Sequence, residues 1–142
     1  MEKLSPTTEA ILQNRFGCDN LLALATTDGT IPYVRAINAY YEAGAFYGIT
    51  CATSGKMNQI RENPTVAICG DWFTGHGIGE NLGWIQESTH ADLADKLRTV
   101  FAEWYDDGHV DENDKNTVIL RIRLTDGILY HHGTRYDIDF TE

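Results

Sequence analysis

Apolar and polar residues alternate in short stretches along the first third of the chain. Residues 21–27 form an apolar run that stops at Asp28-Gly29, a dipeptide typical of tight hairpin turns. The alternation resumes over residues 31–41, and Glu42-Ala43-Gly44 then separates it from an apolar segment at 45–50. Successive side chains of a strand point to opposite faces. The pattern therefore predicts three strands joined as an antiparallel meander.

Four later segments have the same strand-like character. In the segment 117–124, the apolar residues Val118, Leu120 and Ile122 lie at every second position, as expected for a strand. Asp126-Gly127 is expected to be a turn between the third and the fourth segment. The tail from residue 133 onward has no clear element. The four predicted strands cover residues 65–73, 75–86, 117–124 and 128–132.

Gly75, Gly77 and Gly79 lie at every second position of the fifth predicted strand. They do not fit the dinucleotide-binding spacing G-x-G-x-x-G, since Glu80 and Leu82 stand where its third glycine would be needed. Glycines within a strand more often mark a bulge, a sharp bend or a close approach of another backbone or a ligand. We expect a bend or bulge here.

Three stretches have helical spacing. The first, residues 6–15, begins after Ser5, a typical N-cap, and the second, residues 54–62, ends at Asn63-Pro64. The third and longest spans residues 90–105 and has one apolar stripe, which is typical of a helix packed on a sheet. The stripe consists of Leu93, Leu97, Val100, Phe101, Trp104 and Tyr105.

These elements predict a mainly β, α+β fold. Six or seven antiparallel strands, one long helix and short flanking helices suit a small barrel. A doubly wound parallel sheet is disfavoured because helices do not alternate with the strands. At 142 residues, the chain is expected to form a single domain.

The charge balance limits the partners of this chain. It has 11 Lys and Arg against 21 Asp and Glu, which argues against a nucleic-acid-binding face. No apolar run reaches the roughly 20 residues of a membrane-spanning helix, and residues 1–6 lack a signal-peptide core. Cys18, Cys51 and Cys69 have no CxxC spacing and are expected to be reduced, mostly buried thiols of a cytoplasmic protein.

Common catalytic and metal-binding signatures do not occur in the sequence. No serine lies in a G-x-S-x-G elbow, and the acidic segment 106–116 lacks the EF-hand spacing, so we expect a solvated loop there. No two histidines have H-x-x-x-H spacing, and the neighbours His131 and His132 are expected to point to opposite faces of a strand. We therefore expect no metal site. No catalytic residue is assigned, and the nearest candidates for acid–base chemistry are His76 and His132.

The stretch 50–64 is the most informative part of the chain. A strand is followed by a small-residue turn and a helix start, where free N–H groups and a partial positive charge favour an anion. Ser54 adds a hydroxyl group and Lys56 a full charge. A lysine at such a position is more often simply solvated, so a phosphate site needs further partners. Arg35 and Asn38 lie on the second predicted strand, which is expected to reach the same edge of the sheet as this helix start. The planar guanidinium group of Arg35 suits the binding of phosphate.

Three pieces of the chain, taken in order, form a recognisable pattern. They are Leu22-Ala-Leu-Ala-Thr-Thr-Asp-Gly-Thr with Pro32-Tyr-Val-Arg35-Ala-Ile-Asn38, then Phe46-Tyr-Gly-Ile-Thr50, then Ser54-Gly-Lys56-Met-Asn-Gln59-Ile-Arg-Glu-Asn-Pro64-Thr-Val-Ala. Together they resemble the pyridoxamine 5′-phosphate oxidase-like family of FMN-binding split β-barrels. The likeness covers the first half well. The second half matches in element order, with Gly77-Ile-Gly79-Glu80 similar to the family's glycine-containing fifth strand.

The resemblance implies FMN bound at the interface of a homodimer, with both protomers lining the site. It implies that Lys56 and Ser54 hold the phosphate group, with Arg35 beside them. The other implied flavin contacts are the strand residues Ala36, Ile37 and Asn38, the Thr50 hydroxyl group, the helix residue Gln59, and Trp72 on the fourth predicted strand.

Two departures from the oxidase branch of the family bear on the substrate. That branch carries a basic pair in the turn where this chain has Gly55-Lys56, and residues 134–140 do not resemble its substrate-binding end. Oxidation of pyridoxamine phosphate itself is therefore disfavoured. The resemblance implies an FMN-binding oxidoreductase acting on an unidentified small molecule. A non-catalytic flavin, haem or deazaflavin carrier of the stress-protein type stays open as the alternative, as does a small barrel that serves only as an interaction domain.

Overall fold

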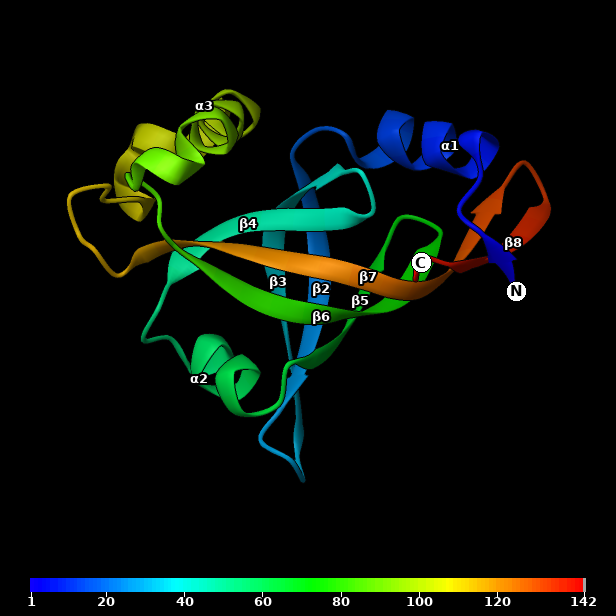
Figure 1. The fold of residues 1–142 in the computed structure, drawn as a ribbon, viewed down its shortest axis with the longest axis horizontal. Coiled ribbons are helices and arrows are strands. Elements are labelled where there is room, and N and C mark those ends of the chain that lie inside the picture. The colour runs from blue at the N-terminus through cyan, green and yellow to red at the C-terminus, as the bar shows by residue number, and fades with distance from the viewer. Residues whose placement is uncertain (142) are drawn as a thin grey trace.

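The computed structural model describes residues 1–141, and these residues form eight strands with helices packed around them (Figure 1). The strands are β1 (Glu2–Lys3), β2 (Asn20–Thr27), β3 (Pro32–Glu42), β4 (Ala45–Cys51), β5 (Thr65–Gly70), β6 (Phe73–Trp84), β7 (Thr117–His131) and β8 (Thr134–Asp139). The helices are α1 (Pro6–Phe16), α2 (Gly55–Glu62), α3 (Ala91–Val100) and α4 (Ala102–Trp104), with a 3-10 turn, η1 (Ser88–His90), before α3 and a π turn, η2 (Tyr105–His109), after α4.

Six of the strands close into an antiparallel barrel. Their order around it is β7-β4-β3-β2-β5-β6, and β6 pairs back with β7. Outside this ring, β8 pairs antiparallel with β7, and β1 pairs with β8 in parallel, which places residues 2–3 beside residues 138–139. The predicted mainly β, antiparallel barrel with flanking helices is confirmed.

The barrel interior is one buried cluster, and two helices contribute to it from opposite sides (Figure 1). Phe16 of α1 and Ile60 of α2 both pack against the inward-facing strand residues. The rings of Phe16, Phe46 and Phe73 lie 5.6 to 6.3 Å apart between centroids. Burial of each such aromatic side chain contributes about 1.5–3 kcal/mol. This packing fixes where α2 begins, and therefore where Lys56 lies.

The start of α1 is capped by side-chain hydrogen bonds, as predicted from Ser5. The Ser5 hydroxyl group accepts a hydrogen bond from the Thr8 backbone N–H at 3.2 Å, and the Thr8 hydroxyl group accepts one from the Ser5 N–H at 2.9 Å. This reciprocal pair is a capping box, which satisfies two backbone donors at the helix start. Pro6 occupies the first turn, where its missing N–H has no cost.

The helix predicted over residues 90–105 is present but broken. The backbone leaves helical geometry at Phe101 (φ −96°, ψ 17°) and again at Trp104 (φ −124°, ψ −2°). The break keeps Phe101 buried in a second cluster, beneath α3, while it turns the Trp104 indole toward Asp19, to which its N–H donates at 2.8 Å. An apolar stripe gives the spacing of inward residues, but it contains no signal for such a kink.

Two predictions about the C-terminal third are wrong. Asp126-Gly127 is not a turn, because β7 runs unbroken through it. A Cβ atom at Gly127 would lie 2.6 Å from the Phe73 ring, so the glycine permits close packing there. The turn comes later, at His132-Gly133, where both residues have positive φ (48° and 79°). It leads into β8, a strand in the tail for which the sequence predicted no element.

The glycines of β6 behave as expected. The pairing register with β7 shifts between His76 and Gly77, which marks a bulge. A Cβ atom at Gly77 would lie 2.8 Å from the Arg123 carbonyl oxygen, and one at Gly79 would lie 2.9 Å from the Ile60 side chain. Because Gly77 and Gly79 have no side chain, β7 and α2 can pack closely against β6.

The cysteines differ from expectation. Cys18, Cys51 and Cys69 are free, as expected, but all three are exposed. Cys18 follows α1, Cys51 ends β4, and Cys69 lies on the outer face of β5, so none reaches a core. In the described part of the chain, no helix has the length and apolar character needed to span a membrane.

Candidate functional site

The barrel opens between β3 and β4. These strands pair only at their hairpin end, residues 40–42 with 45–47. Beyond it, β3 still pairs with β2 and β4 with β7, so the facing edges of residues 35–39 and 48–51 have no strand partner within residues 1–141. Where the strands diverge, a Cβ atom at Gly48 would lie 3.0 Å from the Asn38 carbonyl oxygen. Such unpaired edges offer backbone N–H and C=O groups to a ligand.

A cavity of about 640 Å³ lies at this opening, within the usual range for small-molecule sites. Residues 36–38 of β3 and 48–51 of β4 form two of its sides. Lys56 of α2, Trp104 of α4 and residues of the segment 108–114 complete the lining. The cavity therefore gathers parts of the chain that are more than 70 positions apart.

Lys56 and Arg35 give the site its electrostatic character. Burial lowers the pKa of Lys56 below its ordinary value, and the nearby Arg35 charge lowers it further. Burial also lowers the pKa of Arg35. Neither side chain forms an ion pair with a carboxylate in the described part of the chain. Two neighbouring cations without a counter-ion favour an anionic ligand.

Arg35 is held in place by neutral groups. Its guanidinium group donates to the Thr26 hydroxyl oxygen at 2.7 Å, to the Leu24 carbonyl oxygen at 3.1 Å and, weakly, to the Gln59 amide oxygen at 3.5 Å. The Thr26 hydroxyl group in turn donates to the same Gln59 oxygen. These contacts fix the side chain and leave its charge uncompensated.

Ser54 is the N-cap of α2. Its hydroxyl oxygen accepts a hydrogen bond from the Met57 N–H at 3.4 Å. The hydroxyl proton is not used in that contact and can be donated to a ligand oxygen. The positive end of α2, the Ser54 hydroxyl group and the Lys56 ammonium group thus come together at one helix start.

The Asn38 side chain belongs to a small polar chain. Its amide donates to one carboxylate oxygen of Asp19 at 3.0 Å, and the Trp104 indole N–H donates to the other at 2.8 Å. Asp19 therefore links two side chains that line different sides of the cavity.

The structure brings eight of the nine predicted cofactor contacts together. Arg35, Ser54 and Gln59 lie around Lys56 without lining the cavity. The other five line it directly: Ala36, Ile37, Asn38, Thr50 and Lys56.

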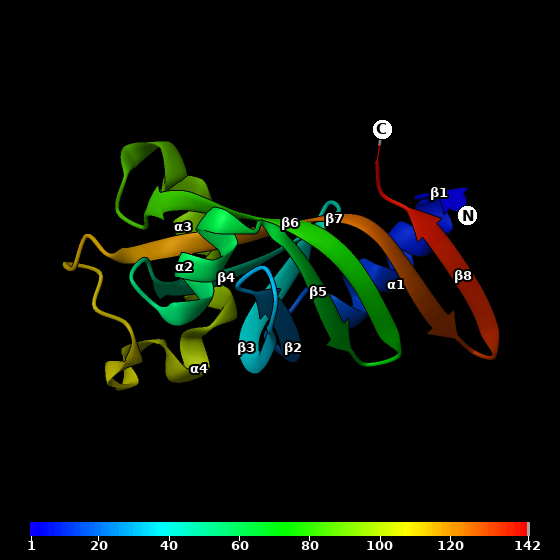
Figure 2. The same cartoon turned by 90° about the horizontal axis from the view of Figure 1, so that it is seen from below.

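Trp72 stands apart from the other predicted contacts. The prediction that it lies on the fourth strand is wrong, because β5 ends at Gly70 and Phe73 turns into the barrel core. Trp72 is in the intervening turn with φ 55°, is 70% exposed, and packs edge-on against Tyr130 with ring centroids 6.3 Å apart. Figure 2 shows this hairpin tip on the side of the molecule away from α2.

Several lining residues have no predicted role. The segment 106–116 is expected to be only a solvated loop, yet His109, Val110 and Asp111 line the cavity, and Trp104 does so as well as joining the core stripe. Cys51 also lines it, and a hydrogen bond with the Thr53 hydroxyl group lowers the pKa of this thiol. The one sequence feature that could have indicated this role is the length of the segment 106–116, since long irregular loops in small domains are often functional.

The two histidines considered for acid–base chemistry, His76 and His132, lie away from the cavity. His76 is 2.9 Å from Asp126 on the outer face of the barrel. His131 and His132 do not point to opposite faces, because β7 ends at His131, and their rings stack with centroids 4.0 Å apart. Neither His76 nor His132 lines the cavity. Among residues 1–141, no three His, Cys, Asp or Glu side chains are grouped to hold a metal ion.

An antiparallel barrel that splits between two strands, with a small-molecule cavity and a cation pair at the split, defines a split β-barrel. Solved structures share this fold. A FAD-binding protein from Mesorhizobium loti is 18% identical, with a TM-score of 0.68, and the match covers 87% of this chain and 92% of the other. General stress protein 26 from Bacillus anthracis is 15% identical, with a TM-score of 0.64 over 91% and 97% of the two chains.

A third similar structure connects the fold with the resemblance seen in the sequence. It is a protein of the pyridoxinephosphate oxidase family from Clostridium acetobutylicum, related to general stress protein 26, with 16% identity and a TM-score of 0.57 over 84% and 85% of the chains. No protein-family model and no curated protein matches the sequence. The resemblance to pyridoxamine 5′-phosphate oxidase-like proteins is therefore confirmed at the level of the fold.

Proposed function

We propose that this protein is an FMN-binding oxidoreductase acting on a small molecule. The observation that carries the proposal is the Arg35–Lys56 pair, two half-buried cations beside a helix start with no counter-ion among the described residues. A phosphate dianion would neutralise both charges, and the Ser54 hydroxyl group is placed to donate to it. These features fit FMN better than a cofactor without a terminal phosphate group.

The ring of the cofactor has a matching place in this proposal. Residues 36–38 present a free strand edge to the cavity, so their N–H and C=O groups are available to the polar edge of a flavin. Thr50 offers a hydroxyl group from the opposite strand. A bound flavin supplies the hydride or electron transfer, while the chain supplies orientation and electrostatics.

We further propose a homodimer. The outer face of β2, β3 and β5 carries small or apolar side chains, and Leu21 and Val34 on it are 70% and 71% exposed. An apolar groove of about 280 Å³ runs over this face and includes Val34, two residues from Ala36 in the cavity. Large exposed apolar faces mark interaction sites. A second copy seated here would cover the open side of the cavity.

The cofactor is tested by titrating purified protein with FMN and following flavin fluorescence and absorption. We expect a flavin-type spectrum and saturable binding at micromolar concentration or tighter. Riboflavin, which lacks the phosphate group, is the matched control and should bind at least about tenfold more weakly, since charge-assisted contacts contribute about 1.5–3 kcal/mol. Equal binding of the two, or none, would remove the proposal.

The dimer is tested by light scattering of the wild type and of Val34→Glu. The wild type should have twice the chain mass, and the buried charge should give a monomer with weaker FMN binding. A wild-type monomer that binds FMN with full affinity would refute the proposed dimer and leave the proposed cofactor unaffected.

A carrier without turnover is the second candidate, favoured by the shared fold of general stress protein 26. Mixing the FMN complex with NADH or NADPH under anaerobic conditions separates the two functions. Bleaching of the flavin absorbance near 450 nm supports an oxidoreductase, and no bleaching over hours supports a carrier.

A further inference from the structure

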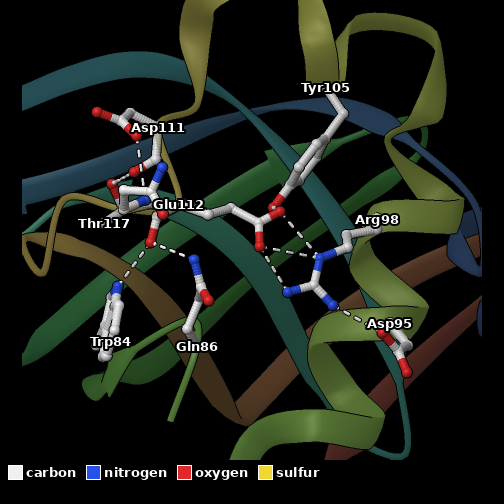
Figure 3. Close-up of polar contacts among 9 residues, drawn as sticks. Trp84, Gln86, Asp95, Arg98, Tyr105, Asp111, Glu112 and Thr117 are labelled. Carbon is white, nitrogen blue, oxygen red and sulfur yellow. Dashed lines mark hydrogen bonds and ion pairs between the residues drawn. The ribbon is translucent and has the colours of Figure 1, made fainter.

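The segment 105–116 forms one wall of the cavity, and Glu112 anchors the middle of it. Figure 3 shows this residue at the centre of a polar network that reaches α3 and the end of β6. We infer that Glu112 is a positioning residue, which holds this wall against the cavity and so controls how long the ligand stays bound. The inference rests on the proposed function for the identity of that ligand.

The Glu112 side chain binds α3. The Arg98 guanidinium group donates to its two carboxylate oxygens, with Nε at 2.9 and 3.1 Å and Nη2 at 2.6 Å, and the Tyr105 hydroxyl group donates at 2.7 Å. The carboxylate is about three-quarters buried. The Arg98 contact holds the pKa of Glu112 below its ordinary value, so the ion pair is fully formed at neutral pH.

The Glu112 backbone binds a different element. Its carbonyl oxygen accepts from the Trp84 indole N–H at 2.9 Å and from the Gln86 amide at 2.8 Å. Side chain and main chain of one residue therefore connect the segment to α3 and to the end of β6 together. Both anchors are well packed, because Leu97 of α3 and Ile85 after β6 are fully buried together with Phe101 in the second cluster.

The anchored segment carries the lining residues. Val110 and Asp111 lie immediately before Glu112, and Asp114 follows it, all at the cavity. The remaining hydrogen bonds of residues 107–114 are short-range, such as the Asp114 N–H to the Asp111 carbonyl oxygen at 3.2 Å. The far end of the segment is held separately, by the Ala52 N–H to the Asn116 carbonyl oxygen at 2.7 Å and by Lys115 over the Trp84 ring. Long polar segments of this kind are otherwise mobile. Loss of the anchor should therefore release the wall while the barrel remains folded.

The test compares Glu112→Gln with Glu80→Gln. Glu80 is a matched control, since its carboxylate also accepts two hydrogen bonds from one arginine, Arg121, and is about 70% buried. Its further hydrogen bond comes from Arg123, so its hydrogen-bond partners lie on β7 and not on the segment 105–116. Amide hydrogen exchange is measured over residues 108–117, and FMN dissociation is measured by stopped flow. Glu112→Gln should accelerate both by about tenfold or more, whereas Glu80→Gln should change neither by more than about twofold. Iodide quenching of residual bound-flavin fluorescence should rise only in Glu112→Gln.

Unchanged exchange and dissociation in Glu112→Gln would overturn the inference. Equal acceleration in both variants would overturn it as well, because it would reflect a general loss of stability. The exchange measurement needs no ligand. If the wild type binds no FMN, the proposed function fails, and exchange alone then decides whether Glu112 holds the wall.

Discussion

Replacing Lys56 by methionine should move ligand affinity and stability in opposite directions. Lys56 lies beside Arg35 in a half-buried site, and burial and this like charge both lower its pKa. The unfolded chain therefore holds the Lys56 proton more tightly than the folded chain does. Removal of the charge should leave the stability of the ligand-free protein unchanged or higher, whereas an ordinary ion-paired lysine stabilises the fold.

The effect on FMN binding should be large. A hydrogen bond between charged groups contributes about 1.5–3 kcal/mol, so the Kd for FMN should rise about 10- to 150-fold in Lys56→Met. At an FMN concentration of 100 times the wild-type Kd, the ligand stabilises the wild type by about 2.7 kcal/mol. A 100-fold weaker variant would gain only about 0.4 kcal/mol at that concentration.

Urea unfolding with and without FMN measures both quantities, and fluorescence titration gives the Kd directly. Lys96→Met is the matched control, because Lys96 forms an ion pair with Glu42 on the outer surface. It should leave the Kd unchanged and slightly lower the stability of the ligand-free protein. The reasoning is refuted if Lys56→Met behaves like Lys96→Met, or if its Kd changes less than threefold.

Three further predictions follow from the same contacts. FMN affinity should fall as the pH is raised, starting below the ordinary lysine value of 10.5, because Lys56 loses its proton early; titrations of Lys56→Met at the same pH values should lack this loss. Asp19→Ala should lower the free energy of unfolding by about 1–3 kcal/mol in urea, since the Asn38 and Trp104 donors lose their acceptor. Gly79→Ala should cost about 1–3 kcal/mol and weaken FMN binding, because its Cβ atom would push Ile60 and α2 outward, whereas Gly55→Ala, with no atom within 4 Å, should be neutral in the same assays.

Local chemistry accounts for what the sequence predicts correctly. Asp28-Gly29 specifies its hairpin through the Asp28 carboxylate, which accepts from the N–H groups of Thr30 and Ile31 at 2.9 and 2.8 Å. Those partners lie two and three residues away, so the turn is readable from the chain alone. The meander and the capped first helix were predictable for this reason. Arg35 and Lys56 lie 21 positions apart, so their expected proximity depended on the predicted strand pairing and on the family resemblance.

Contacts between distant segments account for what the sequence does not predict. Asp126-Gly127 has the composition of a turn, but Phe73, more than 50 positions earlier, requires the glycine for packing. Glu112 likewise depends on Arg98 and Trp84, 14 and 28 positions away. No local sequence pattern distinguishes a loop that is anchored over a cavity from one that is solvated. The role of the segment 105–116 as a cavity wall is therefore visible only in the folded structure.

The Gly55-Lys56 turn, where the oxidase branch carries a basic pair, gains a different meaning from the structure. Gly55 faces open space, so packing does not forbid a second cation there. A second cation is nevertheless present, since Arg35 reaches the neighbourhood of Lys56 from β3, held by Thr26 and Gln59. The number of positive charges therefore does not weaken the case for a phosphate ligand. Gly55 leaves open space beside Lys56. Under the proposed function, the difference from the oxidase branch would therefore concern the substrate and not the binding of the cofactor phosphate group.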